Sequence, residues 1–330
     1  MKTLIVGSRV GKEEEGINFY EFDESKGTLH HHVGVDGIPQ PTFQCFDHKR
    51  RMLYSVSETE TDGHIYAYHV AADFSCTQRF CIPSTGGSPC HVALNQDGTL
   101  LSVANYGDGV LLVLDVSTAP PKERYRKAFP GKGTHPTRQE RSHIHSSLFS
   151  SGLLYVADLG LDHILRYNED LSSLSPLETP PGTGPRHMWA SPEQRILYVA
   201  AELSSELLVY QKETLIQRIS TLPEAFSGEN TVADIHLSSD AQFLYCSNRG
   251  HDSVAIFKKN TSDGTLALIG HCLTEREPRN FSLSPSGRWL LAANGSSDSI
   301  TIHPIDVKTG LAGAFTHRYE LLQPVCLTFI

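Results

Sequence analysis

A short pattern of apolar and polar positions recurs along the whole chain. Residues 234–257 read DIHLSSDAQFLYCSNRGHDSVAIF, in which apolar runs with alternating polar positions are separated by clusters of Ser, Asp, Asn and Gly. Period-two alternation between such clusters is typical of short β-strands joined by tight turns. This stretch therefore predicts three consecutive strands.

The middle strand of this pattern recurs at intervals of 43 to 53 residues. A leucine anchors each copy, at Leu4, Leu53, Leu101, Leu154, Leu197, Leu244 and Leu290. A period of this length over a whole chain marks a repeat architecture, and four-stranded repeats of this size are propeller blades. A β-solenoid usually has shorter repeats, and capping segments cover its two ends. Neither end of this chain resembles such a cap. We therefore predict an all-β, seven-bladed β-propeller, formed by residues 1–330 as a single domain.

The two ends of the chain carry complementary parts of one repeat. Elsewhere an apolar run led by a proline precedes the anchoring leucine by 12 residues, as at Pro41, Pro89, Pro185 and Pro278. Pro324–Ile330 has this pattern with no strand after it, whereas Lys2–Gly7 and Ile17–Glu21 resemble middle and outer strands with no first strand before them. We predict that these segments form one closing blade, which leaves no free sheet edge in the ring.

Residues 117–142 interrupt the repeat with sequence rich in Pro, Lys and Arg, which accounts for the longest interval. One interpretation is a mobile surface loop. The other is an inserted loop over one mouth of the propeller, where Arg138, Gln139 and Arg141 would be available. The pattern favours neither.

Charge and composition narrow the possible partners. With 28 basic and 37 acidic residues the net charge is −9, which disfavours nucleic acid but not a small anion bound by a local arginine cluster. The chain has no apolar run long enough to span a membrane, and the apolar run at Leu4–Val6 is too short for a signal peptide, so we expect a cytoplasmic protein. The 7 cysteines include no Cys-x-x-Cys pair, and we expect free thiols.

Three adjacent histidines, His30, His31 and His32, suggest a metal site at first sight. In a strand, however, their side chains point to alternating faces, and no carboxylate or thiol spacing accompanies them. A solvated strand end is the better interpretation.

Functional sites of propellers are built from positions that recur once per blade. The position after the leading proline holds Thr42, Cys90, Arg186, Ala233, Arg279 and Val325. The next position holds Phe43, His91, His187, Asp234, Asn280 and Cys326. In the third complete blade the register is ambiguous between His143 and His145, and the apolar spacing that follows favours His145.

A second set of polar residues ends the middle strands. It consists of Ser57, Asn105, Asp158, Ala201, Asn248 and Asn294, followed by Glu58, Tyr106, Leu159, Glu202, Arg249 and Gly295. Amides and carboxylates at strand ends are typical of hydrogen bonds that tie blades together, which is the structural interpretation of Asn294 and its equivalents.

The arginines need another explanation. Arg186, Arg249 and Arg279 would repel one another unless an anion joined them, and a guanidinium suits carboxylate or phosphate. With Glu202 and His145 as acid or base candidates, the sequence predicts a site that binds an organic anion and moves a proton. His187, His91 and Asn294 are further candidates for contact with the substrate. The oligomeric state is left open.

Several runs resemble a known family. They are Gly-Pro-Arg-His-Met (184–188), Ala-Glu-Leu (201–203), Cys-Ser-Asn-Arg-Gly (246–250), Val-Ala-Asp-Leu-Gly-Leu-Asp (156–162) and Pro-Arg-Asn-Phe (278–281). Together they resemble the seven-bladed lactonase family, which includes propeller-type 6-phosphogluconolactonases and carboxy-cis,cis-muconate lactonising enzymes. The resemblance implies active-site roles for His145, Arg186, Glu202 and Arg249. It departs from the family pattern in the third complete blade, where the turn after the His-x-His pair is shorter.

The primary hypothesis is a lactone hydrolase of the 6-phosphogluconolactonase type, which needs no metal or other cofactor. Arg186 and Arg249 would hold the anion and polarise the lactone carbonyl, and Glu202 or His145 would take a proton from water. A cycloisomerase that closes a carboxymuconate to a lactone is the alternative enzyme. A non-enzymatic scaffold resembling WD-repeat proteins is a third hypothesis, although the Trp-Asp dipeptide is absent.

A metal-dependent lactonase is a fourth hypothesis. Its oxygen ligands would come from Asn105, Asp158, Asn248 and Glu202. The three nearby arginines would oppose a divalent ion, so this hypothesis ranks below the others.

Overall fold

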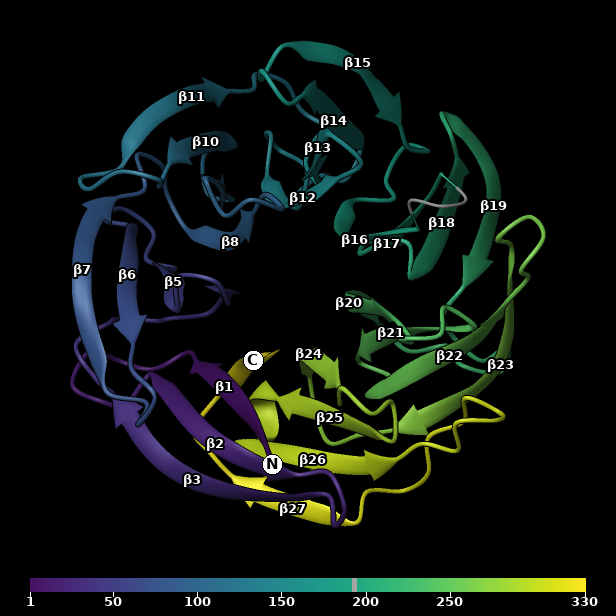
Figure 1. The fold of residues 1–330 in the computed structure, drawn as a ribbon. Helices are drawn as coiled ribbons and strands as arrows, with labels where there is room; N and C mark the ends of the chain where they lie inside the picture. Colours follow the sequence, from purple (N-terminus) through teal and green to yellow (C-terminus); the bar gives the residue numbers. More distant parts are fainter. Residues whose placement is uncertain (192–194) are drawn as a thin grey trace. The chain divides into compact units, whose positions relative to one another are not determined.

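The computed structural model describes residues 1–191 and 195–330. Within these ranges, 28 strands form seven four-stranded antiparallel sheets, the blades of a seven-bladed β-propeller (Figure 1). In six sheets the strands follow one another in chain order, and the seventh joins the last strand to the first three. The predicted fold class is confirmed.

The contacts within the chain define two compact units. Unit 2 comprises residues 10–17 and 33–186. Its first sheet consists of β4 (Gln44–Asp47), β5 (Met52–Ser57), β6 (His64–Val70) and β7 (Cys76–Pro83). Its second sheet consists of β8 (Pro89–Leu94), β9 (Leu100–Asn105), β10 (Val110–Asp115) and β11 (Lys122–Ala128). Its third sheet consists of β12 (Ile144–Ser150), β13 (Leu153–Asp158), β14 (His163–Asn168) and β15 (Ser173–Glu178).

Unit 1 comprises residues 1–9, 18–32 and 187–330. One of its sheets consists of β16 (Pro185–Ser191), β17 (Ile196–Ala201), β18 (Glu206–Gln211) and β19 (Thr214–Ser220). The next consists of β20 (Thr231–Leu237), β21 (Phe243–Arg249), β22 (Ser253–Lys259) and β23 (Leu266–Leu273). A third consists of β24 (Pro278–Leu283), β25 (Trp289–Asn294), β26 (Ser299–Pro304) and β27 (His317–Glu320). Strand β16 begins in unit 2 and continues in unit 1.

The closing blade is built from both ends of the chain, as predicted. Its strands are β28 (Pro324–Phe329), β1 (Lys2–Ser8), β2 (Ile17–Asp23) and β3 (Thr28–Val35), in that order (Figure 1). Strand β28 pairs with β1 in antiparallel register, so that Leu4 is opposite Phe329 and Val6 is opposite Leu327. The edge of β1 is therefore satisfied by backbone hydrogen bonds.

The apolar core is divided into clusters between neighbouring sheets. In unit 1, Tyr198 and Val209 of one sheet pack with Leu244 and Phe257 of the next, and all four are buried. The second and third strands of each sheet supply most of these side chains, and the fourth strands are largely exposed. Strands such as β9 and β17 are buried on both faces and read as nearly continuous runs of buried residues, whereas outer strands such as β19 alternate between exposed and partly buried side chains.

The predicted loop at 117–142 needs correction, because its middle part is a strand. Strand β11 (Lys122–Ala128) pairs with β10 along its length and completes the blade. Its side chains are almost all exposed, so no apolar alternation marks it in the sequence. Lysines and arginines on such an outer strand also discourage edge-to-edge pairing with another molecule. The true connection to β12 is the segment 129–143.

The histidine run and the cysteines agree with the structural interpretations. His30, His31 and His32 are exposed on β3, where His32 Nε2 lies 3.4 Å from Glu21 Oε2. All 7 cysteines are free thiols; four are buried, and Cys81 is exposed. In the part of the chain that the structure describes, no helix has the length and apolar character needed to cross a membrane.

Candidate active site

A β-bulge recurs near the start of the first strand of several sheets. The register shifts there in β8, β12, β20, β24 and β28. The residues at the shift are Cys90, His145, Ala233 with Asp234, Arg279 and Val325. A bulge adds one residue that the ladder does not pair, so it changes the direction of a side chain. This local geometry explains why chemically varied residues occupy the position after the leading proline.

The bulge also resolves the register of the third complete blade. In β12, Ile144 is opposite Asp158 and Ser146 is opposite Ala157, which leaves His145 at the bulge. His145 is thus the structural equivalent of Cys90 and Arg279. His143 lies before the strand, and both of its ring nitrogens face protein oxygens, Nδ1 at 2.8 Å from Tyr106 O and Nε2 at 3.3 Å from Glu140 Oε1.

In unit 2, a hydrogen bond connects the chain segments that carry His145 and Arg186. The Ser146 hydroxyl donates this bond to the backbone carbonyl of Arg186. His145 is 5% exposed and Arg186 is 2% exposed. A buried guanidinium is costly unless its donors meet acceptors.

Two aspartates of the Val-Ala-Asp-Leu-Gly-Leu-Asp run position the strands that carry His145 and Arg186. The Asp158 carboxylate accepts hydrogen bonds from Ser142 Oγ at 2.6 Å and His143 N at 2.9 Å, two residues before His145. Burial raises the pKa of the Asp158 carboxyl, and these hydrogen bonds oppose that rise. Asp162 accepts hydrogen bonds from the backbone N–H groups of Gly182 at 2.7 Å and Gly184 at 2.8 Å, just before Arg186.

The Asp162 arrangement recurs in unit 1. Asp252 accepts a hydrogen bond from Glu277 N, and Asp298 accepts one from Gln323 N, each just before the first strand of the next sheet. Asp162, Asp252 and Asp298 all have positive φ, between 49° and 56°, a conformation that Asp tolerates better than most residues. These aspartates therefore set where each following strand begins.

Replacement of Asp162 by Ala is expected to lower the free energy of unfolding by about 2–4 kcal/mol, because two backbone N–H groups lose a charged acceptor. Urea unfolding followed by fluorescence measures the change. Asp170→Ala is the matched control, since Asp170 is exposed and bonds only to Ser172 among the contacts that the structure describes; its expected effect is about 0.5 kcal/mol or less. Equal unfolding midpoints for the two variants would contradict the positioning role of Asp162.

In unit 1, Glu202 and Arg249 form a buried ion pair. Glu202 directly follows β17, and Arg249 ends β21, so both lie at the same ends of the second strands of their sheets. Arg249 Nη2 is 3.2 Å from Glu202 Oε1 and donates to Val232 O at 3.3 Å. The Glu202 side chain is 2% exposed, and that of Arg249 is 14% exposed. Each charge offsets the cost of burying the other.

Asp234 joins three first strands of unit 1 through its carboxylate. His187 Nδ1 lies 2.7 Å from Asp234 Oδ1, His236 Nε2 lies 2.8 Å from Oδ2, and the Asn280 amide also donates to Oδ2. Burial opposes ionisation of Asp234, but the charge and hydrogen bonds of His236 and His187 outweigh it and hold the pKa of the carboxyl far below its usual range. His187 is thus engaged in a structural tie through one ring nitrogen.

Three other predicted site residues have different surroundings. The His91 ring stacks on Phe43 with 4.2 Å between centroids, and its Nδ1 accepts a long hydrogen bond from Ser147 N. Arg279 lies half-buried at the bulge of β24. Asn294 is fully buried, and its amide donates to Ala292 O and to the hydroxyls of Ser299 and Thr301 in its own sheet. These bonds tie strands within one blade and not neighbouring blades, so the structural interpretation of Asn294 needs correction.

Tyr106 is a residue that the sequence argument did not select. Its ring stacks on His143 at 4.3 Å and meets the His145 ring edge-on at 5.5 Å. Tyr106 follows β9 as Glu202 follows β17, so its place in the repeat could have identified it. Around these residues, and elsewhere in residues 1–191 and 195–330, no group of three or more His, Cys, Asp or Glu side chains is placed to hold a metal ion.

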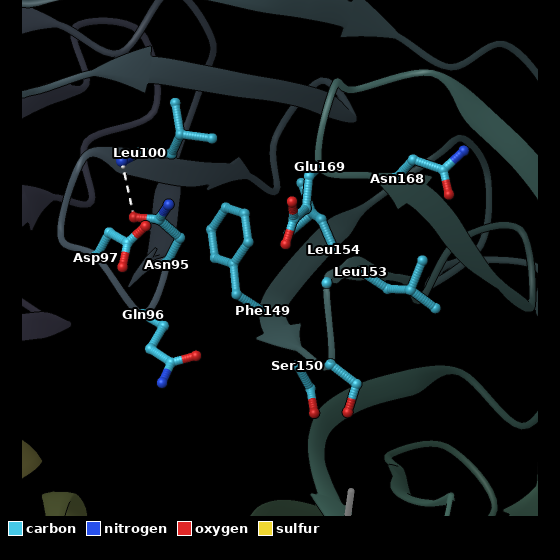
Figure 2. A pocket seen from close by; sticks show the side chains of 12 residues that line it. Asn95, Gln96, Asp97, Leu100, Phe149, Ser150, Leu153, Leu154, Asn168 and Glu169 are labelled. Carbon is cyan, nitrogen blue, oxygen red and sulfur yellow. Dashed lines mark hydrogen bonds between the residues drawn. The ribbon is translucent and has the colours of Figure 1, made fainter.

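Unit 2 also contains a cavity of about 300 Å³, at the other end of its strands. Figure 2 shows Phe149 in this cavity between Asn95 and Glu169. Ser150 lines it, five residues along β12 from His145, or roughly 16 Å in an extended strand. Among the described residues, the lining includes Asp97 and Glu169 and no Arg, Lys or His, so its charge does not favour an anionic substrate.

The fold and these side chains define a class of protein. The chain belongs to the lactonase family of seven-bladed β-propellers, whose family model matches residues 3–329. This match confirms the family resemblance that the sequence runs indicated.

Individual relatives are similar along nearly the whole chain. The 6-phosphogluconolactonase of Bacillus subtilis is 30% identical, with 98% of this chain and 97% of that protein covered. The 6-phosphogluconolactonase of Formosa agariphila is 33% identical, with 93% of each chain covered. Among solved structures, the periplasmic gluconolactonase of Pseudomonas aeruginosa has a TM-score of 0.92 and 28% identity, with 100% of this chain and 99% of that chain covered.

Proposed function

We propose that the protein is a lactone hydrolase that acts on an anionic sugar lactone, in the manner of a 6-phosphogluconolactonase. The observation that carries this proposal is the buried Glu202–Arg249 pair, 3.2 Å apart, in a chain of the lactonase family. A carboxylate and a guanidinium in contact supply a base for water and a positive charge for a developing oxyanion. The names of the two bacterial relatives support the substrate class.

The hydrolysis uses these groups as follows. A water oxygen attacks the lactone carbonyl carbon while Glu202 accepts the proton that the water loses. Arg249 stabilises the negative charge on the carbonyl oxygen of the tetrahedral intermediate. When the bond from the carbonyl carbon to the ring oxygen breaks, Glu202 returns the proton to that oxygen, and the product is the open-chain hydroxy acid.

Arg186 and His145 have supporting roles in this proposal. The Arg186 guanidinium binds the substrate anion, and Arg279 is a further contact for it. His145 is the alternative acceptor for the proton of water. No metal takes part in the proposed steps, and a cytoplasmic location stays a prediction.

Proton release from freshly generated 6-phosphoglucono-δ-lactone at neutral pH tests the proposal against the spontaneous rate. We expect acceleration by the protein, insensitivity to EDTA, and a loss of about 100-fold or more in Arg186→Ala, because the anion loses its guanidinium. Arg186→Lys, which keeps the charge, should retain part of the activity. Arg218→Ala is the control. Arg218 lies on the exposed strand β19, and its side chain pairs with Glu206 of β18.

Other outcomes would favour one of the alternative hypotheses. A folded protein with no lactonase activity would overturn the proposal, and carboxymuconates would be the next substrates to test. Loss of activity in EDTA, restored by a divalent cation, would favour the metal-dependent hypothesis. Inactivity toward both substrate classes would favour a scaffold.

A further inference from the structure

Asn230 lies just before β20 and connects the turns that follow Glu202 and Arg249. Its Nδ2 donates a hydrogen bond to Ser205 Oγ at 2.9 Å, three residues after Glu202. Its Oδ1 accepts one from His251 N at 3.1 Å, two residues after Arg249. All of these residues belong to unit 1, so one side-chain amide holds together the two turns next to the charged pair.

The backbone around Asn230 makes the same connection. Asn230 O accepts a hydrogen bond from Ser205 Oγ at 3.1 Å, and Val232 N donates to Glu202 O at 3.3 Å. Val232 O in turn accepts a hydrogen bond from Arg249 Nη2 at 3.3 Å. This short segment therefore contacts both members of the ion pair.

A buried polar network supports the Asn230 side chain. Asn248 of β21 is fully buried, and its Oδ1 accepts hydrogen bonds from Asn230 Nδ2 at 3.2 Å and Thr221 Oγ1 at 2.7 Å. Thr221 N donates to Ser205 O at 3.0 Å, which returns the network to the turn where it began. Hydrogen-bonded networks in the interior rigidify the segments that they join.

Gly250 allows the backbone before β20 to approach the turn after Arg249. Its φ is 122°, and a Cβ there would overlap Glu229 O and lie 3.0 Å from Asn230 Cα. Only glycine adopts this conformation and leaves this space without strain. The segment and the turn are therefore in close contact, and a shift of one would displace the other.

A base and an oxyanion donor act on one carbonyl group only when their separation is fixed, and a misplacement of about 1 Å can cost about 100-fold in rate. Glu202 and Arg249 come from two different sheets. We infer that Asn230 is a positioning residue, which holds Glu202 and Arg249 at the separation that turnover needs. This inference rests on the proposed lactonase function, and Asn230 itself makes no contact with the substrate in it.

Hydrolysis of 6-phosphoglucono-δ-lactone by the native protein and by Asn230→Ala tests the inference. In Asn230→Ala, kcat is expected to fall about 10- to 100-fold, because the base and the guanidinium are no longer held in place. KM is expected to change less than about twofold, because the side chain that binds the substrate anion in the proposed mechanism is intact. A native kcat in folded Asn230→Ala overturns the inference.

Asn95→Ala is the matched control. Asn95 clamps the turn between β8 and β9, where its Oδ1 accepts hydrogen bonds from Thr99 N at 2.8 Å and Leu100 N at 2.9 Å and its Nδ2 donates to Thr99 Oγ1 at 3.1 Å. It lines the cavity at the other end of the strands of unit 2. We expect a lower urea unfolding midpoint in both variants and a native kcat in Asn95→Ala. An equal loss of kcat in the two variants would show a general effect of destabilisation and would also overturn the inference.

Unfolding experiments separate this inference from the proposed function. Glu202→Gln is made in the native protein and in Asn230→Ala, and the shift of the urea midpoint is compared. If Asn230 holds the ion pair together, the shift should be at least about halved in the Asn230→Ala background. This result supports the positioning role even when the native protein hydrolyses no lactone, an outcome that overturns only the proposed reaction. Equal shifts in the two backgrounds overturn the inference, whatever the activity.

Discussion

Replacement of Glu202 by Gln is expected to lower kcat for lactone hydrolysis by about 10²–10⁴-fold, the usual contribution of a general base. Gln keeps the shape and the burial of the side chain but cannot accept the proton of the attacking water. Arg249 remains 3.2 Å from the substituted position and still stabilises the oxyanion, so some acceleration over the spontaneous rate should survive. KM should change little, because Glu202 makes no bond to the anionic group of the substrate in the proposed mechanism.

Glu206→Gln is the matched control for Glu202→Gln. Glu206 also pairs with an arginine, since Arg218 Nη2 donates to its Oε2 at 2.8 Å, but this pair lies between β18 and β19. The exposed pair is expected to contribute about 0.2–1 kcal/mol to stability and nothing to turnover. Full turnover in Glu202→Gln, with a normal unfolding midpoint, would remove Glu202 from the proposed role and direct attention to His145.

Replacement of Asp234 by Asn is expected to lower the free energy of unfolding by about 3–5 kcal/mol, the cost of removing one partner from a buried charged cluster. Asp234 is buried and holds His187 at 2.7 Å and His236 at 2.8 Å. Asn keeps one acceptor oxygen but places an amide donor where the second oxygen accepted hydrogen bonds. The midpoint of urea unfolding at pH 7 measures the loss.

The same variant should show a distinct pH dependence. The pKa of Asp234 is depressed in the folded protein, so its contribution to stability is fully present above the unfolded value of about 3.9 and is lost as the pH falls further toward the folded value. The difference in stability between native protein and Asp234→Asn should therefore shrink as the pH falls below about 3.9. Asp240→Asn, in an exposed turn of the same sheet, should change neither quantity. A variant as stable as the native protein at pH 7 would contradict the assigned role of Asp234.

The repeat was predictable from the sequence because apolar runs recur at a regular interval between clusters of Ser, Asp, Asn and Gly. The leading prolines, the anchoring leucines and the two complementary chain ends together specify the blades and the closing blade. Strand β11 was not predictable, because the side chains on both of its faces are largely exposed and its sequence shows no apolar alternation. A pattern based on burial cannot detect a strand that is held mainly by backbone hydrogen bonds to one neighbour.

In the candidate site, too, the repeat predicted some positions, and the local backbone geometry made others ambiguous. Repeat position alone placed His145 and Arg186 on equivalent strand starts and Glu202 and Arg249 on equivalent strand ends. The neighbouring positions were ambiguous, because a bulge shifts the direction of side chains without leaving a mark in composition. His187 and Arg186 are adjacent in sequence, yet the first donates to Asp234 and the second carries the backbone carbonyl that Ser146 contacts.

The pairing of β28 with β1 has a consequence for how the chain acquires its structure during synthesis. Leu4 and Phe329 are opposite each other, so this contact closes a loop of more than 300 residues, at an entropic cost of roughly 5 kcal/mol from length alone. The ribosome releases β1 long before β28 exists, and until then β1 has an open edge that could pair with another nascent chain. Completion of the closing blade thus has to wait for the synthesis of β28, and the interval before it is the period in which the edge of β1 is open to self-association.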